Sequence, residues 1–361
     1  MRREISINVD ATTFHPNPVP SDLLRLPGLK HISVSWPLLH LAIWTRSPLA
    51  PPGLQLSDYW AWLRYARAYK RTTDLRLNDE WQQVDPHQKT ILSDELGVGF
   101  TTYALSEYAR YRRFCNTLFV ARTASPIPIT IGPARGPRRR RAPDYIAENS
   151  SGNFVAVECK GRQTVPSSLR AALRSGVAQK QNVTRHSPIV CLGLVGGLFI
   201  PQSSSTSSGF IEFHDPPPED LIRVFESLTK DEIRRSVLRG ALSNQLFLAG
   251  AVRASREIAS NRDDAQLTPA AQDEVRQLAQ RQTVYSTSSI PTWTDDGFSA
   301  SVSASISAEV IQLLVAPEPL NKMLSRTSNE WSHRDDDKGQ FAAITSPDGF
   351  TYELTTVIAE G

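Results

Sequence analysis

Apolar residues between 87 and 113 recur at spacings of three and four, the period of one face of a helix. Leu92, Leu96 and Phe100 belong to this series, and the pattern predicts a helix over 87–113. Asp85 followed by Pro86 is typical of the residues that begin a helix. Gly97 and Gly99 lower helical stability, so we expect them to mark close packing against another element.

Four short apolar runs after this helix predict strands. They cover residues 116–122, 144–148, 154–160 and 188–195, and residues 127–131 extend the first run or form an additional strand. The sequence NSSGN between the second and third runs is typical of a turn, so these two strands are predicted to form an antiparallel hairpin. A second helix is predicted from Ser167 or Ser168 to Val183, before the last strand.

This reading divides the chain into three parts. Residues 1–85 form an N-terminal region predicted to be mostly helical, and residues 86–202 form an α/β unit. A Ser-rich segment, 202–208, leads to a C-terminal α+β region, 209–361. In that region helices are predicted over 232–259 and 269–282, and strands over 298–315 and 340–357, with a hairpin turn at 346–349.

Composition excludes several classes of protein. The longest apolar run, 190–200, is about half the length of a membrane span and contains three glycines, so we expect no membrane helix. The N-terminus lacks the apolar stretch of a secretory signal. The three cysteines, Cys115, Cys159 and Cys191, are far apart and form neither a disulfide framework nor a Cys-x-x-Cys metal site. A cytoplasmic location fits these features best.

The formal net charge of +3 conceals a strongly basic segment. Residues 110–185 hold thirteen arginines and two lysines against three acidic residues, a formal charge of +12, which leaves −9 for the rest of the chain. Such a segment is typical of proteins that bind polyanions. A solvated basic loop is the alternative interpretation.

The strongest chemical pattern is Pro143-Asp144 followed by Glu158-Cys159-Lys160. A hairpin turn centred on Ser151 places residue 144 opposite residue 158. Glu158 and Lys160 lie two residues apart and therefore project from the same face of a strand. The pattern thus predicts two carboxylates and one ammonium group together at one end of a hairpin. The alternative is a surface hairpin with a weak cross-strand ion pair.

Two adjacent carboxylates repel each other unless a cation binds between them. Oxygen ligands with open positions suit Mg²⁺, with Mn²⁺ as a substitute. Such a metal polarises a phosphoryl oxygen and helps generate a hydroxide nucleophile. The carbonyl of Cys159 is a candidate further ligand, and the Lys160 ammonium is suited to position the attacking water.

At these residues the sequence resembles the PD-(D/E)XK phosphodiesterase superfamily, the fold of many restriction endonucleases and DNA-repair nucleases. The resemblance covers about a third of the chain. It implies an α/β fold with a restriction-endonuclease-like core of a helix, three antiparallel strands, a helix and a fourth strand. It also implies that Asp144 and Glu158 bind the metal and that Lys160 assists the water.

The resemblance implies further site residues. An acidic residue on the first helix often completes the metal site, and Glu95 is the candidate, with Asp94 or Glu107 as alternatives. Gln179 and Lys180 are candidates on the second helix for contact with the water or a phosphate. A mobile loop of arginines beside the site suits binding of the nucleic-acid backbone. The candidates for that role are Arg135, Arg138, Arg139, Arg140, Arg141 and Arg162.

The sequence therefore predicts a Mg²⁺-dependent deoxyribonuclease of bacterial restriction, anti-phage defence or mobile-element biology. Its flanking regions are expected to set substrate choice, form a homodimer or bind a partner protein. One alternative is a non-catalytic nucleic-acid-binding or assembly subunit that retains the fold. Another is an RNase or toxin effector that uses the same site, because the sequence does not separate RNA from DNA.

Overall fold

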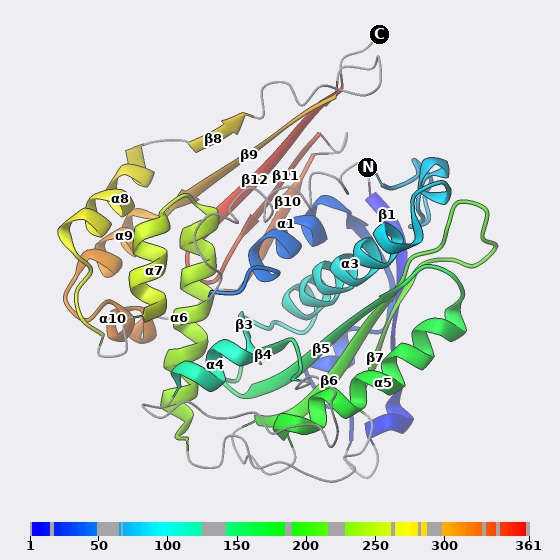
Figure 1. The fold of residues 1–361 in the computed structure, drawn as a ribbon, viewed down its shortest axis with the longest axis horizontal. Helices are drawn as coiled ribbons and strands as arrows, with labels where there is room; N and C mark the ends of the chain where they lie inside the picture. The colour runs from blue at the N-terminus through cyan, green and yellow to red at the C-terminus, as the bar shows by residue number, and fades with distance from the viewer. Residues whose placement is uncertain are drawn as a thin grey trace.

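The computed structural model shows two β-sheets with helices packed on and between them (Figure 1). It describes residues 2–14, 18–48, 65, 68–124, 142–184, 190–215, 228–260, 264–280, 283–286, 298–326, 330–336 and 340–358.

A mixed seven-stranded sheet forms the larger unit, in the order β2-β1-β7-β6-β5-β4-β3. Its strands are β1 (Arg2–Val9), β2 (Gly28–Ser33), β3 (Arg113–Asn116), β4 (Tyr145–Glu148), β5 (Phe154–Arg162), β6 (Val190–Phe199) and β7 (Phe210–His214). β3, β4 and β5 are antiparallel neighbours, whereas β6 is parallel to β5 and occupies the centre of the sheet. The chain is therefore a mixed α/β protein.

Helices cover both faces of this sheet. They are α1 (Ser35–Trp44), α3 (Pro86–Glu107), α4 (Thr117–Thr123) and α5 (Pro166–Thr184), together with short 3₁₀ helices at Ala11–Phe14, Leu23–Arg25 and Asp79–Gln82. Along β5, Val155, Val157 and Cys159 belong to the core formed with α1 and α3. The alternate residues Phe154 and Ala156 belong to a second cluster with α4 and α6 (Lys230–Leu248).

A second sheet of five antiparallel strands has the order β10-β11-β12-β9-β8. Its strands are β8 (Thr283–Ser286), β9 (Phe298–Ile306), β10 (Ser332–Asp335), β11 (Phe341–Thr345) and β12 (Phe350–Ile358), and the helices beside it are α7 (Val252–Ser260), α8 (Pro269–Gln280), α9 (Ala308–Val315) and α10 (Pro319–Ser325). Buried residues of both sheets, such as Ile7 and Tyr352, belong to one continuous core.

Several predicted boundaries change. The N-terminal region was predicted to be mostly helical, yet β1 and β2 belong to the large sheet. β7 also belongs to that sheet, between β1 and β6, although it lies beyond the predicted boundary at residue 209. Because strands pair across these boundaries, residues 1–85 and 86–202 do not form separate units. The five-stranded sheet, in contrast, arises wholly from the predicted C-terminal region.

Local signals explain the other differences. The predicted helix over 87–113 ends at Glu107, where the chain turns at Arg110 in a left-handed conformation (φ 60°). The predicted strand over 116–122 is wrong, because the Asn116 side chain accepts hydrogen bonds from the backbone N–H groups of Leu118 and Phe119 and begins α4. Residues 127–131 lie outside the described residues.

The C-terminal predictions differ in two places. Gly250, with a φ of 92°, separates α6 from α7 within the predicted helix over 232–259. Ser307 ends β9 and caps α9, so the second half of the predicted strand over 298–315 is helical. The predicted hairpin at 346–349 is confirmed, with Gly349 at a φ of 83°. None of the helices in the described residues combines the length and apolar character needed to span a bilayer.

Candidate active site

Asp144 and Glu158 lie at the same end of the β4–β5 hairpin. Tyr145 is opposite Val157 and Glu148 is opposite Phe154, a register that continues to Asp144 opposite Glu158. The turn is closed by the Asn149 side chain, which accepts hydrogen bonds from the backbone N–H groups of residues 151 and 153. The predicted hairpin and its register are confirmed.

Three groups of this hairpin lie together. The backbone N–H of Cys159 donates a hydrogen bond to Oδ2 of Asp144 at 2.8 Å. The Lys160 ammonium donates to Oε1 of Glu158. The other carboxylate oxygen of Glu158, Oε2, is buried and has no hydrogen-bond partner among the described residues, and the residue is only 1% exposed. A buried carboxylate oxygen with no partner is a position that a cation satisfies.

Burial makes both carboxylates difficult to ionise. Burial, and then the charge of Asp144, raise the pKa of Glu158 to about 8, although the Lys160 ammonium opposes the shift. Burial also raises the pKa of Asp144, against the hydrogen bond from Cys159 and the charge of Lys160. Carboxylates with raised pKa values that share one location are typical of metal and catalytic sites.

Helix α3 contacts the hairpin strand through two glycines. A Cβ added to Gly97 would lie 2.5 Å from the carbonyl oxygen of Lys160, and one added to Gly161 would lie 1.6 Å from the carbonyl oxygen of Ser93. A Cβ added to Gly99 would lie 2.4 Å from the carbonyl oxygen of Pro37 in α1. The expected close packing at Gly97 and Gly99 is therefore confirmed. Cys159 and Gly161 face α3, so Glu158 and Lys160 face the opposite side of the sheet.

The acidic residues of α3 have different partners. Glu95 accepts a hydrogen bond from the Tyr65 hydroxyl. Asp94 forms an ion pair with Arg162 at 3.0 Å, and its charge contributes to the raised pKa of Asp144. Within the described ranges, no three His, Cys, Asp or Glu side chains are grouped so that they could hold a metal ion. The structure therefore does not bring Glu95 into a three-ligand set with Asp144 and Glu158.

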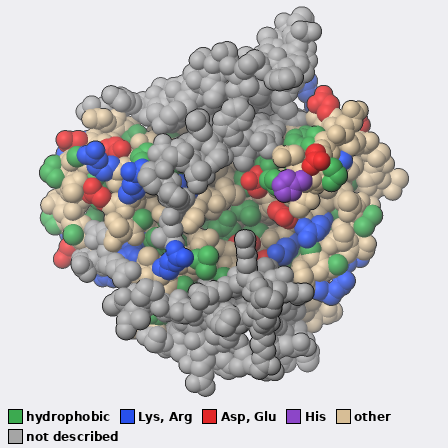
Figure 2. All heavy atoms as spheres, in the orientation of Figure 1, with side chains coloured by type: hydrophobic (Ala, Val, Ile, Leu, Met, Phe, Trp, Pro, Cys, Tyr) green, Lys and Arg blue, Asp and Glu red, His purple; other side chains and the backbone are tan. Residues whose placement is uncertain are grey.

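The other candidates lie partly outside the described residues. Arg135 and Arg138 to Arg141 are in the segment 125–141, which the structure does not describe. Gln179 and Lys180 lie on α5 by their backbone positions, and their side chains are outside the described part. Glu107, an alternative acid for the site, instead contacts His333, with 2.5 Å between Oε2 and Nδ1. On the face in Figure 2, described basic and acidic side chains are interspersed.

Sequence reasoning missed two residues around the site: Tyr65, whose hydroxyl donates to Glu95, and Gly161, which permits the approach of α3. It named Asp94 as an alternative acid but did not identify the ion pair of Asp94 with Arg162. A signal existed only for Gly161, because a glycine inside a strand commonly marks close approach of another backbone. The partners of Tyr65 and Asp94 are distant in sequence, and no local pattern identifies them.

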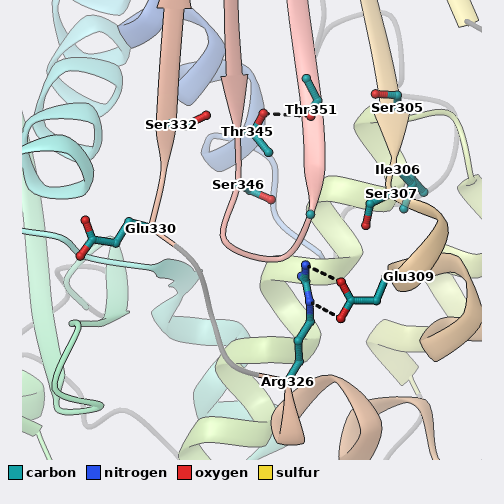
Figure 3. Close-up of a pocket in the computed structure, with 11 residues that line it drawn as sticks. Ser305, Ile306, Ser307, Glu309, Arg326, Glu330, Ser332, Thr345, Ser346 and Thr351 are labelled. Atoms are coloured by element: carbon teal, nitrogen blue, oxygen red, sulfur yellow. Dashed lines mark hydrogen bonds and ion pairs between the residues drawn. The ribbon is translucent and has the colours of Figure 1, made fainter.

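Two cavities lie elsewhere. One, of about 400 Å³, opens beside the five-stranded sheet and is lined mainly by hydroxyl groups and by the Arg326–Glu309 ion pair (Figure 3). The other, of about 550 Å³, is bordered by Asp22, Asn149 and Asp215. Neither is lined by Asp144, Glu158 or Lys160.

The chain was compared with known proteins. No protein-family model, curated protein or solved structure matches it.

Proposed function

We propose that this protein is a metal-dependent nuclease with a restriction-endonuclease-like core, and that it hydrolyses phosphodiester bonds of DNA. The observation that carries the proposal is the β4–β5 register, which puts Asp144 opposite Glu158 and leaves Lys160 in contact with Glu158. Two carboxylates and an ammonium on one hairpin end match the residues that resemble the PD-(D/E)XK superfamily.

The donor set fits a hard divalent cation. Asp144 and Glu158 would hold Mg²⁺, because the buried Oε2 of Glu158 has no hydrogen-bond partner in the part of the chain that the structure describes and both carboxyl groups have raised pKa values. Mg²⁺ commonly uses one or two protein carboxylates and fills its other positions with waters and substrate phosphates. Two ligands from the chain are therefore sufficient. When bound, Mg²⁺ supplies Lewis-acid polarisation of the phosphate and a lowered pKa for its water.

Other groups around the two carboxylates have separate roles in the proposed reaction. The Cys159 N–H fixes the orientation of the Asp144 carboxylate. The Lys160 side chain is 17% exposed, and its ammonium contacts Glu158. A cation in that position orients a water molecule and stabilises the negative charge that develops on the phosphate. The Gly97 and Gly161 contacts hold the strand against α3 and limit its movement.

The order of elements also supports the proposal. α3, β3, β4, β5, α5 and β6 follow one another as helix, three antiparallel strands, helix and strand, with the short helix α4 inserted after β3. In the proposal the basic segment binds the DNA backbone, and Arg162, two residues beyond Lys160 on β5, is one of its described members. Binding through phosphates should weaken strongly as the salt concentration rises.

A cleavage assay tests the proposal. Purified protein is incubated with duplex DNA, single-stranded DNA and RNA, with Mg²⁺, with Mn²⁺ or with a chelator. We expect metal-dependent cleavage of DNA by the native chain, and a loss of at least about 100-fold in Asp144→Asn, Glu158→Gln and Lys160→Met. Glu353→Gln, which changes a strand carboxylate in the other sheet, is the matched control and should retain activity.

The outcomes separate the alternatives. Cleavage confined to RNA would change the proposed substrate from DNA to RNA and leave the proposed site unchanged. Nucleic-acid binding without cleavage under any metal would favour a non-catalytic binding subunit. Cleavage that survives Glu158→Gln would show that the hairpin is not the active site.

A further inference from the structure

Two buried histidines join the two sheets of the molecule. His40 lies in α1 and is fully buried, and His333 lies in β10, the edge strand of the five-stranded sheet. Their Nε2 atoms are 3.1 Å apart. The indole N–H of Trp44 donates to Nδ1 of His40 at 3.3 Å, and Nδ1 of His333 lies 2.5 Å from Oε2 of Glu107.

The partners determine where each proton lies. Tryptophan only donates, so Nδ1 of His40 must accept and its proton must be on Nε2. His40 then donates to Nε2 of His333, whose own proton is on Nδ1 and faces the Glu107 carboxylate. The His40 ring is therefore neutral, and the Trp44–His40 and His40–His333 hydrogen bonds each contain one proton, whereas Nδ1 of His333 lies beside the Glu107 carboxylate without a hydrogen bond. A metal ion between the two Nε2 atoms is incompatible with this arrangement, because His40 carries its proton there.

One added proton necessarily breaks the chain. If His333 gains a proton on Nε2, two N–H groups face each other across 3.1 Å. If His40 gains one on Nδ1, it faces the N–H donor of Trp44. Glu107 can stabilise a charged His333, but the repulsion then passes to His40 or to Trp44. The contact between α1 and β10 cannot hold an extra proton in its present geometry.

The surroundings contain few other charges. Tyr103 of α3 packs against both imidazoles and contacts the hydroxyl of Tyr108. Asp335, two residues beyond His333 on β10, is paired with Arg2 of β1 at 2.8 Å. Glu107 is the carboxylate that contacts the pair directly, through His333.

Aromatic residues complete the junction between the sheets. Trp331 packs against His40, and Trp36 packs against His333. The Trp36 indole donates to the carbonyl oxygen of Arg334 at 3.0 Å, which attaches α1 to the backbone of β10. Burial, and then the neighbouring His333, lower the pKa of His40 well below its ordinary value, in agreement with a neutral ring.

We propose that His40 and His333 form a pH-sensitive latch, which holds edge strand β10 against helix α1 at neutral pH and releases it on acidification. Release frees the outer edge of the five-stranded sheet and loosens α1. The latch also lies close to the hairpin that carries Asp144, because the Tyr145 hydroxyl donates to the carbonyl oxygen of Trp44 at 3.0 Å. The proposal stands on the histidine geometry and does not depend on nuclease activity.

Hydrogen exchange of the full-length protein measures the release. Amide protection of β10 is compared at pH 8 and pH 5 after correction for intrinsic exchange rates. His40, neutral in the closed state and an ordinary histidine in the open state, alone predicts an opening constant about 30-fold larger at pH 5. The double variant His40→Gln/His333→Gln should change less than about 3-fold over the same range. His87→Gln, at an exposed histidine, should keep the full increase.

Each outcome decides the proposal. A wild-type increase below about 3-fold, or an undiminished increase in the double variant, overturns it. If the double variant does not fold, ¹⁵N spectra of histidine-labelled wild-type protein give the answer. Neutral rings with protons on Nε2 of His40 and Nδ1 of His333 at pH 8 support the latch. The opposite tautomers, or a charged ring at pH 8, refute it.

Discussion

Replacement of Asp348 by alanine should destabilise the whole molecule, because Asp348 neutralises a buried arginine. Arg113 of β3 donates to Oδ1 of Asp348 from Nε and Nη2, at 2.9 and 2.7 Å, and to Oε2 of Glu148 from Nη1 at 2.7 Å. Gln245 of α6 donates to the other oxygen of Asp348 at 3.0 Å. The three charged side chains are 6%, 4% and 1% exposed for Arg113, Glu148 and Asp348.

The magnitude follows from the charges that remain. Burial alone would lower the pKa of Arg113, but Asp348 and Glu148 raise it above its ordinary value, so the guanidinium stays charged. Asp348→Ala leaves that charge with one carboxylate and leaves the Gln245 amide without its acceptor. Removing one partner of a buried ion pair costs about 3–5 kcal/mol. Asp348→Asn keeps the shape and an acceptor oxygen, so we expect a smaller loss, about 1–3 kcal/mol.

Denaturant unfolding at pH 7 measures the loss as a shift in midpoint at constant slope. The double variant Arg113→Met/Asp348→Leu should recover part of the stability, because both charges leave the interior together. Arg276→Ala, which removes an exposed ion pair with Asp273, is the control and should cost less than about 0.5 kcal/mol. A loss below about 1 kcal/mol in Asp348→Ala would refute the reasoning, because the buried network would then be no stronger than a surface pair.

Three further predictions concern the candidate site. The pKa of Glu158 is higher in the folded than in the unfolded state, so its ionisation destabilises the fold as pH rises from about 4.5 to about 8. Glu158→Gln should therefore stabilise the metal-free protein at pH 8 by about 2–4 kcal/mol, and an unchanged thermal-unfolding midpoint would contradict this. Gly161→Ala should destabilise the protein by about 3 kcal/mol or more, because the new Cβ overlaps the Ser93 carbonyl. A free energy of unfolding within about 1 kcal/mol of wild type would show that α3 can move away. Tyr65→Phe should lower stability by about 1 kcal/mol through loss of the hydroxyl bond to Glu95, and a neutral result in the same measurement would mean that water replaces the hydroxyl.

Local chemistry made the site hairpin predictable. Turn residues at 149–153 and alternating apolar residues on either side fix the register, so Asp144 and Glu158 follow directly from the sequence. The two glycines of α3 were also readable as close contacts, since glycine inside a helix is unfavourable without a packing reason. Each of these inferences needs only residues that are near one another in the chain.

The errors arose where distant residues decide the structure. The run 116–122 has an apolar pattern that suits a strand, but capping by Asn116 and packing of Phe119 against α6 make it helical. The pairing of β7 with β1 joins segments about 200 residues apart, and no local pattern encodes it. The same holds for Glu95, whose partner Tyr65 comes from the N-terminal region.

Divalent-ion binding to the hairpin tests the central claim most directly. Isothermal titration of the native chain with Mn²⁺ is compared with Asp144→Asn, Glu158→Gln and the control Glu353→Gln, after circular dichroism shows that all four are folded. The account predicts saturable binding by the native chain and the control, and an affinity at least about 10-fold lower in each site variant. Equal affinity in all four proteins would place the ion elsewhere and contradict the account.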